Sequence, residues 1–217
     1  MSTETLRETG YSPTAAVAVY AVFAGAVPAT VGVHGHGGAA VPDALLASLA
    51  AVAVAPLAWR LVAPAASGPL LVVALCSAGA AAIHFGVARE HVAEWWLFGV
   101  FFVGSALAQL AWAIGALVRR TASILVAGAV GNAAIIALWV VTRTSGLPFG
   151  PDAGGAEAVG VADVAASVLE SVIVLGTIVL LFGRGVGTTR LRAVPAIAFV
   201  GPVVVGLTTA ALVSPVG

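Results

Sequence analysis

The feature that most constrains this chain is a series of long, uninterrupted apolar segments. A helix needs about 20 apolar residues to cross the hydrocarbon core of a bilayer. The sequence has seven segments of this kind, and only 8% of its residues are charged, against roughly 25% in soluble domains. We therefore predict an all-α fold, a polytopic transmembrane helical bundle forming a single integral membrane domain over residues 1–217. The expected spans cover residues 15–33, 44–62, 69–87, 95–118, 121–141, 161–182 and 194–213.

The arginines predict how these spans are oriented. Positively charged residues concentrate in cytoplasmic loops. With a cytoplasmic N-terminus, seven of the nine arginines lie inside, and only Arg89 and Arg143 lie outside. An odd number of spans then places the C-terminus outside. We expect a multi-pass protein of the cell membrane, with the lipid bilayer as its main surroundings.

Composition also excludes several classes of function. The sequence contains no lysine, so it cannot form the lysine Schiff base of the seven-helix retinal proteins. A formal net charge of zero argues against nucleic acid as a partner. Cys76 is the single cysteine, which excludes an intramolecular disulfide and a thiolate metal cage. A protein partner or a homo-oligomer is left open.

Histidines and acids gather where the spans are expected to reach the outer, extracytoplasmic face. Imidazole and carboxylate without thiolate suit Zn, Fe, Mn or Cu. We predict that His84, His91, Glu94 and Asp163 bind such a divalent transition metal. His84 and His91 would lie about 10.5 Å apart along an unbroken helix, too far to share one ion. Either the helix breaks after Gly86, or the two histidines serve different levels of a path.

The His91 region has a second interpretation, and another histidine pair is a further candidate for metal binding. The His91 region is also typical of a solvated interfacial loop, in which Trp95 and Trp96 anchor the helix ends. His34 and His36 form an H-x-H pair in a glycine-rich loop, which suits secondary capture of a metal ion. The same pair is equally typical of a polar turn between two spans.

A second set of polar residues is expected inside the membrane. Glu170 follows Asp163 by seven residues on one helix face, about 13 Å below the interface. A carboxylate at that depth is costly unless it is paired, hydrated or protonated, and such residues usually mark ion or proton pathways. Asn132 and Ser105 are expected near the same depth, with Gln109 one turn deeper. We predict an intramembrane relay; the alternative is hydrogen bonding between helices.

Arg143 runs against the charge bias of the outer loops. It ends the fifth expected span, just before the longest connection in the chain. An arginine in this position predicts an acidic partner, and Glu157 and Asp163 are the candidates. We expect the connecting loop to be braced by this pairing as a lid over the polar cluster.

Three short motifs carry a resemblance. They are I-H-F-x-V-x-x-E-H at 83–91, G-L-P-F-G-P at 146–151 and E-x-V-G-x-x-D at 157–163. Together they resemble a group of small multispanning membrane proteins of high-GC bacteria, over about the central half of the chain. The resemblance implies a multispanning fold and brings no activity or functional residue with it.

Three functions are compatible with these patterns. The first is metal transport or proton-coupled transport through the outer His and carboxylate cluster. The second is a membrane-embedded metalloenzyme acting on a lipid or small apolar substrate, with a glutamate as general base. The third is a structural or regulatory membrane subunit. A deep pocket beside the cluster that opens laterally to lipid favours the enzyme, and a polar path continuing to the cytoplasm favours transport. Pairwise salt bridges among Arg89, Arg143 and the acids, with no room for an ion, favour the subunit.

Overall fold

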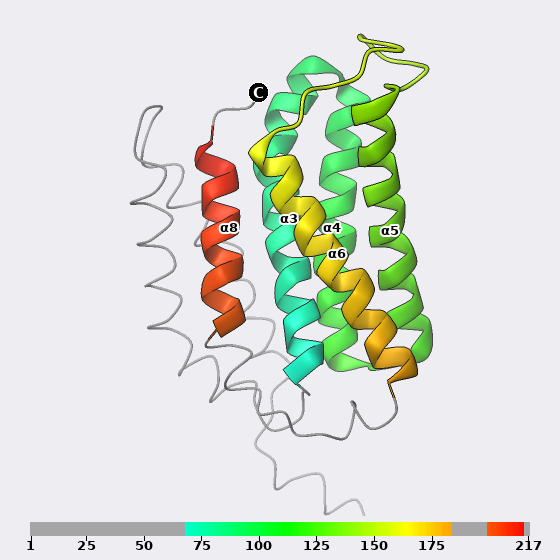
Figure 1. Cartoon of the computed structure of the whole chain (residues 1–217), viewed down its shortest axis with the longest axis vertical. Coiled ribbons are helices and arrows are strands. Elements are labelled where there is room, and N and C mark those ends of the chain that lie inside the picture. The colour runs from blue at the N-terminus through cyan, green and yellow to red at the C-terminus, as the bar shows by residue number, and fades with distance from the viewer. Residues whose placement is uncertain (1–67, 184–198, 215–217) are drawn as a thin grey trace, which may run out of the picture.

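All regular structure in the described part of the chain is helical. The structure is a computed structural model, and it describes residues 68–183 and 199–214. Five helices lie in these residues, with no strand among them (Figure 1). They are α3 (Gly68–Glu94), α4 (Trp96–Val118), α5 (Ala122–Thr144), α6 (Val161–Phe182) and α8 (Gly201–Val213).

Four of these helices are long and apolar enough to cross a membrane. Helices α3 to α6 contain 27, 23, 23 and 22 residues, and a span needs about 20. Helix α8 has 13 residues and covers the second part of the segment expected at 194–213. The prediction of an all-α bundle of long apolar helices is thus confirmed for the described residues. The spans expected at 15–33 and 44–62, and both chain ends, lie outside them.

Helix α3 is longer than the sequence predicted. It runs without a break through Gly86 to Glu94, seven residues beyond the expected end of the span. Residues 88–94 contain no glycine or proline that would end a helix. The chain turns at Trp95, whose backbone is extended, and α4 begins directly after it. Gly99 permits this tight turn, because a Cβ there would lie 1.9 Å from the side chain of Val92.

Among the described helices, α3 is also the central one. Across its most apolar stretch 72% of residues are buried, compared with 22% in α4, 17% in α5 and 39% in α6. Small residues let its neighbours approach closely. A Cβ at Gly79 would lie 2.5 Å from Val204 on α8, and a Cβ at Gly176 on α6 would lie 2.4 Å from Val73.

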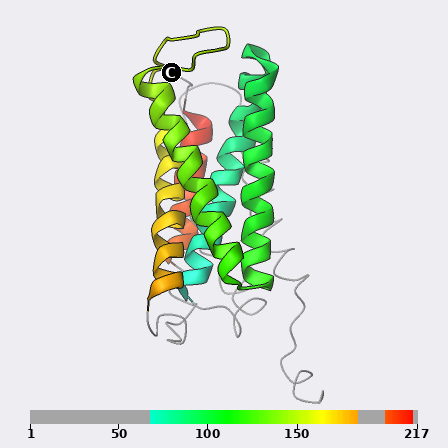
Figure 2. The same cartoon turned by 90° about the vertical axis from the view of Figure 1, so that its right-hand side faces the viewer.

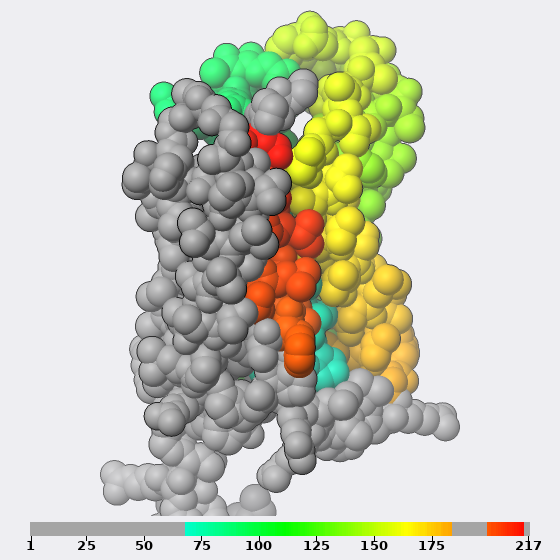
Figure 3. Space-filling model, turned by 60° about the vertical axis from the view of Figure 1, so that its left-hand side comes forward, coloured from blue at the N-terminus to red at the C-terminus, as the bar shows by residue number. Residues whose placement is uncertain are grey.

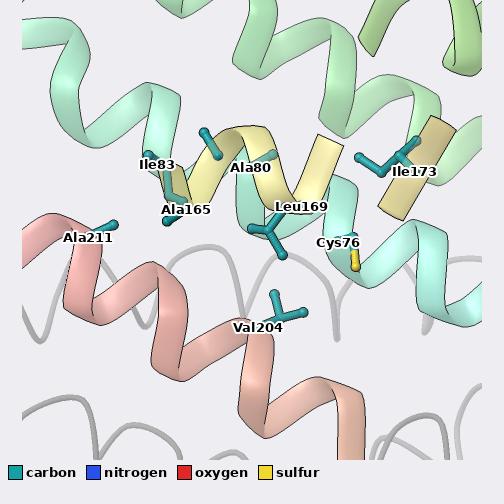
Figure 4. Packing of buried hydrophobic residues seen from close by; sticks show 9 residues of the cluster. Cys76, Ala80, Ile83, Ala165, Leu169, Ile173, Val204 and Ala211 are labelled. Carbon is teal, nitrogen blue, oxygen red and sulfur yellow. The ribbon is translucent and has the colours of Figure 1, made fainter. Parts of the chain in front are cut away.

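In the described part of the chain, an apolar core joins α3, α6 and α8. Ile83 of α3, Leu169 and Ile173 of α6, and Val204 of α8 are each at most 6% exposed. Figure 4 shows Val204 beside Leu169 at the centre of this cluster. In the space-filling view, α8 lies along α6 on the face turned to the viewer (Figure 3). These three helices therefore form one tightly packed body.

Helices α4 and α5 contact each other between their connecting turn and about mid-bundle. A short turn at 119–121 joins them, and Trp112 Nε1 donates a 2.6 Å hydrogen bond to the Ile124 carbonyl. The Trp112 ring lies against Gly128, where a Cβ would come within 2.2 Å of it. From this turn the two helices diverge towards the other end of the bundle (Figure 2).

The connection between α5 and α6 is an ordered loop over residues 145–160. Gly146 has φ +69°, and a Cβ on it would meet the Gly155 backbone at 2.2 Å, so this position requires glycine. The backbone amide of Glu157 donates to the Thr142 carbonyl at 3.0 Å and ties the loop to α5. We call the end of the bundle that carries this loop and the α3–α4 junction the loop end, and the opposite end the turn end (Figure 1).

Candidate ligand cavity and its ionisable floor

A cavity of about 620 Å³ lies in the half of the bundle nearer the loop end. Side chains of α3, α4, α5 and α6 form its walls, and residues of the 145–160 loop border it at the loop end. Most of the lining is aromatic or aliphatic, including Phe98, Phe101, Phe102, Leu138 and Trp139. Internal cavities of about 300–1,000 Å³ with mainly apolar walls and a few polar groups are typical of small-molecule sites.

The polar groups at the deep side of this cavity are His84 and Glu170. His84 Nε2 lies 3.5 Å from Glu170 Oε1, and both residues line the cavity. Only 4% of His84 and 1% of Glu170 are exposed. The two side chains come from α3 and α6, the helices that pack together in the core. A buried imidazole and carboxyl at this distance can pass a proton between them or hold a cation together.

Gln109 connects this pair to α5. Its Nε2 donates one 3.0 Å hydrogen bond to Glu170 Oε1 and another to Asn132 Oδ1. Asn132 donates in turn to the Gly128 carbonyl at 2.8 Å, and Ser77 donates to the Gln109 carbonyl at 2.8 Å. The result is a buried network that links α3, α4, α5 and α6 around one carboxyl group.

Between this network and the turn end, the described bundle is closed by apolar packing. One cluster of buried residues there joins Leu70, Val73, Ala116, Leu125 and Leu180, and a second is made of alanines of α3 and α4. No Asp, Glu, His or Arg side chain is buried in this half of the described helices. Within the described helices, the polar path therefore continues from the cavity to mid-bundle and ends there.

Arg143 forms ion pairs with both of its candidate partners at the rim of the cavity. It donates to Glu157 through Nη1, and to Asp163 Oδ2 through Nη2 at 2.6 Å. The same Oδ2 of Asp163 accepts a 2.9 Å hydrogen bond from the Gly160 amide at the start of α6. Asp163 thus both caps α6 and pairs with Arg143, and the loop is held to α5 and α6 by these contacts.

The four predicted metal ligands are not brought together. His84 and His91 lie on one unbroken helix at different levels, and the His91 ring stacks on Phe102 with centroids 4.0 Å apart. Glu94 is exposed, and Asp163 is occupied by its cap and ion pair. No group of three His, Cys, Asp or Glu residues that could hold a metal ion occurs in the described residues.

The remaining predicted residues fall into two groups. Ser105 is half-buried on α4 and makes no hydrogen bond to the Glu170 network in the described structure. His34 and His36 lie outside the described residues.

The sequence predicted that the stretch beginning at His84 and the pair Asp163 and Glu170 form two walls of one site, but not that His84 contacts Glu170 directly. With the third span ending at 87, His84 was expected near the interface. In the longer α3, His84 lies ten residues before Glu94, and Glu170 lies nine residues after Val161. At about 1.5 Å per residue these depths agree within about 2 Å. The signal was therefore present in the sequence once the helix end was placed at 94.

The fold and the site together define an all-helical bundle of long apolar helices, consistent with an integral membrane protein, with a buried ionisable pair at the floor of an internal cavity. No protein-family model matches this chain, and no curated protein or solved structure is significantly similar to it.

Proposed function

We propose that this protein is a proton-coupled membrane transporter in which the Glu170–His84 pair is the proton-binding site. The observation that carries this proposal is the 3.5 Å contact between His84 Nε2 and Glu170 Oε1 at the floor of the cavity. Ionisable residues inside transmembrane segments are costly and typically line ion or proton paths. Among the described helices, the cavity leads to the pair from the loop-end half, and apolar packing shields it from the turn end.

One-sided access is what a transporter needs in each of its two alternating states. Transport sites commonly lie near the bilayer midplane, and the surrounding helices rock to open them to one side at a time. The cavity leads from the loop end to Glu170, and the apolar clusters around Leu125 and Ala113 close the turn end. We assign this arrangement to a state open towards the loop end.

The proposal includes an orientation and a span count. We propose seven spans with the N-terminus in the cytoplasm, which places the loop end and its polar cluster on the extracytoplasmic side. Arg119 and Arg120 lie in the turn at the turn end. In the sequence, Arg184 comes two positions after the last residue of α6. Arg89 and Arg143 belong to the loop end. The distribution over the whole sequence favours a cytoplasmic turn end.

Proteoliposomes containing a pH-sensitive dye provide the test. The full-length protein is reconstituted, and Zn²⁺, Mn²⁺ or tetraphenylphosphonium is added outside under an imposed pH gradient. We expect at least one probe to change the internal pH in wild-type vesicles, and we expect Glu170→Gln to abolish that response. Asp152→Asn is the matched control, because it makes the same carboxyl-to-amide change in an exposed loop residue that does not line the cavity. Equal responses in wild type and Glu170→Gln, or none in either, would refute proton coupling.

A second candidate is an enzyme that acts on a lipid or a small apolar substrate. The observation that favours it is the deep apolar cavity directly beside a carboxyl–imidazole pair, since either group can serve as a general base. Mass spectrometry of the lipids in the same vesicles tests it: wild type would convert a lipid that Glu170→Gln leaves intact. An unchanged lipid profile in both would count against this candidate.

Metal coupling is a weaker form of the transport proposal. His84 Nδ1 is buried without a hydrogen-bond partner in the described structure, so one imidazole nitrogen is available. A third ligand is missing from its surroundings among the described residues. The Zn²⁺ and Mn²⁺ arms of the vesicle assay decide whether this form holds.

A further inference from the structure

We infer that the cavity binds a lipophilic organic cation, with its positive charge near Glu170 and its apolar body against the aromatic wall of α4. This inference rests on the proposed function, because it names the class of molecule that exchanges with the proton. It is carried by the charge, the surface and the size of the cavity, and by the face through which a ligand can reach it.

The charges that line the cavity favour a cation. Five carboxyl groups line it, and Arg143 is the one guanidinium among the described lining residues. Arg143 uses Nη1 and Nη2 for Glu157 and Asp163, so those two carboxylates and the guanidinium largely offset one another. Among the described residues, Glu90 and Glu94 at the rim and Glu170 at the floor then have no basic partner other than histidine. A cation entering this space meets attraction at the rim and at the floor.

The walls favour an organic cation over a hydrated metal ion. Phe98, Phe101 and Phe102 of α4 and Trp139 of α5 line the cavity. Aromatic faces attract cations, and the attraction is strongest for ions that lose their water easily. Metal ions instead require several oxygen or nitrogen ligands at short distance, and no such group of His, Cys, Asp and Glu is assembled in the described residues.

The size of the cavity leads to the same class of ligand. A volume of about 620 Å³ is far more than a bare ion needs, and it falls within the range of small-molecule sites, about 300–1,000 Å³. Phe102 lies between the two histidines of α3, with ring centroids 5.7 Å from His84 and 4.0 Å from His91. An apolar body along this wall can therefore extend from the rim to the floor.

The ligand enters the loop-end half of the cavity, through the side of the bundle. At the loop end, the 145–160 loop borders the cavity. The ring centroids of Phe149 and Trp95 are 6.2 Å apart there, and Gly150 lies close to Phe98. Between α4 and α5, which diverge towards the loop end (Figure 2), the lining residues include the exposed side chains Leu97 and Val100. Lipid-facing apolar residues at an opening suit a molecule that first partitions into the bilayer.

The groups around Glu170 couple this cation to a proton. His84 on α3 is the ionisable group in contact with it, while α4 and α5 present the neutral amides of Gln109 and Asn132. Helix α8 contains no ionisable residue. The other ionisable groups on the described cavity wall are Arg143 with Glu157 and Asp163 and, on α3, Glu90, His91 and Glu94. A bound cation therefore competes with the proton held by the Glu170–His84 pair, and its affinity should rise with pH.

Binding of tetraphenylphosphonium to the purified full-length protein tests this inference. The probe is permanently charged and lipophilic, and tetraphenylborate has the same shape with the opposite charge. In equilibrium dialysis against empty micelles as blank, we expect saturable binding of the phosphonium and none of the borate. Glu170→Gln should weaken phosphonium binding by about tenfold or more, Glu170→Asp should retain part of it, and Asp152→Asn should leave it unchanged. In weakly buffered solution, binding should release protons from wild type but not from Glu170→Gln.

The outcomes separate this inference from the proposed function. Equal phosphonium binding in folded wild type and Glu170→Gln, or no saturable binding in folded wild type, overturns the inference. If vesicles then still exchange protons with Zn²⁺ or Mn²⁺ through Glu170, the transport proposal stands without it. If the phosphonium binds through Glu170 but no probe moves protons across vesicles, the cation site stands and transport fails. Circular dichroism and gel filtration establish that each variant is folded.

Discussion

Gln109 is the residue through which four helices meet around one carboxyl group. Its amide nitrogen donates to both Glu170 and Asn132, and its backbone carbonyl accepts from Ser77. Buried polar groups that lose a partner retain the cost of having left water, because no solvent replaces the lost hydrogen bond. This single amide therefore contributes both to the position of Glu170 and to the stability of the bundle.

We predict that Gln109→Leu destabilises the protein by about 1–3 kcal/mol, because Glu170 and Asn132 each lose a hydrogen bond inside the bundle. Thermal unfolding in detergent, followed by circular dichroism, measures the effect. Ser105→Ala, one turn away on the same helix, should change stability by less than about 0.5 kcal/mol. If the two variants unfold at the same temperature, the network is not a source of stability.

The sequence predicted which residues belong to the buried site better than it predicted which of them contact one another. Glu170, Asn132 and Gln109 were expected at similar depths from residue counting alone, and the structure places the three side chains in one network. His84 was assigned to the wrong level, because the end of an apolar segment was taken as the end of the helix. Rotation about the helix axis cannot be read from depth, which is why Ser105 was grouped with them.

Helices α4 and α5 contact each other over only part of their length. They meet at the turn end through Trp112, Ile124 and Gly128, and they separate towards the loop end (Figure 2). Gly128 has no side chain, and the indole ring of Trp112 occupies the space that a side chain at this position would need. The opening beside the cavity lies in the loop-end half, beyond the Gln109–Asn132 hydrogen bond that joins the two helices at mid-bundle.

We predict that Gly128→Ala destabilises the protein by about 1–3 kcal/mol, because its Cβ would overlap the Trp112 ring. Gly131→Ala, on the same helix, meets no atom within 4 Å and should be neutral or stabilising by about 0.5–1 kcal/mol. Thermal unfolding together with tryptophan fluorescence distinguishes the two. Equal stability of both variants would contradict the assigned role of the Trp112 contact.

The helices themselves were largely predictable, since apolar segments of this length have few alternatives. The expected bounds of α6 agree with the structure, and those of α4 differ by one residue. The loop over 145–160 was expected to be braced by Arg143, and the structure shows that arginine bound to Glu157 and Asp163. The cavity could not be derived in the same way, because it results from the relative tilt of whole helices.

On the scale of the whole molecule, the proposed orientation has a convenient probe. Cys76 is the single cysteine of the chain and is only 3% exposed, so the wild-type protein should react slowly with maleimides. A cysteine introduced on the surface therefore reports its own position with little background. Both ends of the bundle offer exposed alanines, Ala153 in the loop and Ala122 at the start of α5.

We predict that Ala153→Cys is labelled by a membrane-impermeant maleimide in intact cells, because the loop end is proposed to face outwards. Ala122→Cys should be labelled only after the cells are permeabilised. Labelling is read as a mass shift of the purified protein. The reverse pattern would invert the proposed orientation while leaving the helical bundle and the cavity unchanged.

The burial of α3 has a consequence for how this sequence can vary. Its alanines and glycines fit against three neighbouring helices, and Ala74 and Ala80 are completely buried. Even one additional methylene group at such positions would push a neighbour aside. In a saturation-mutagenesis screen, α3 should accept the fewest amino acids of the five described helices, whereas the exposed faces of α4 and α5 should accept most apolar ones. A low mutational tolerance would then identify α3 as the central helix among those described.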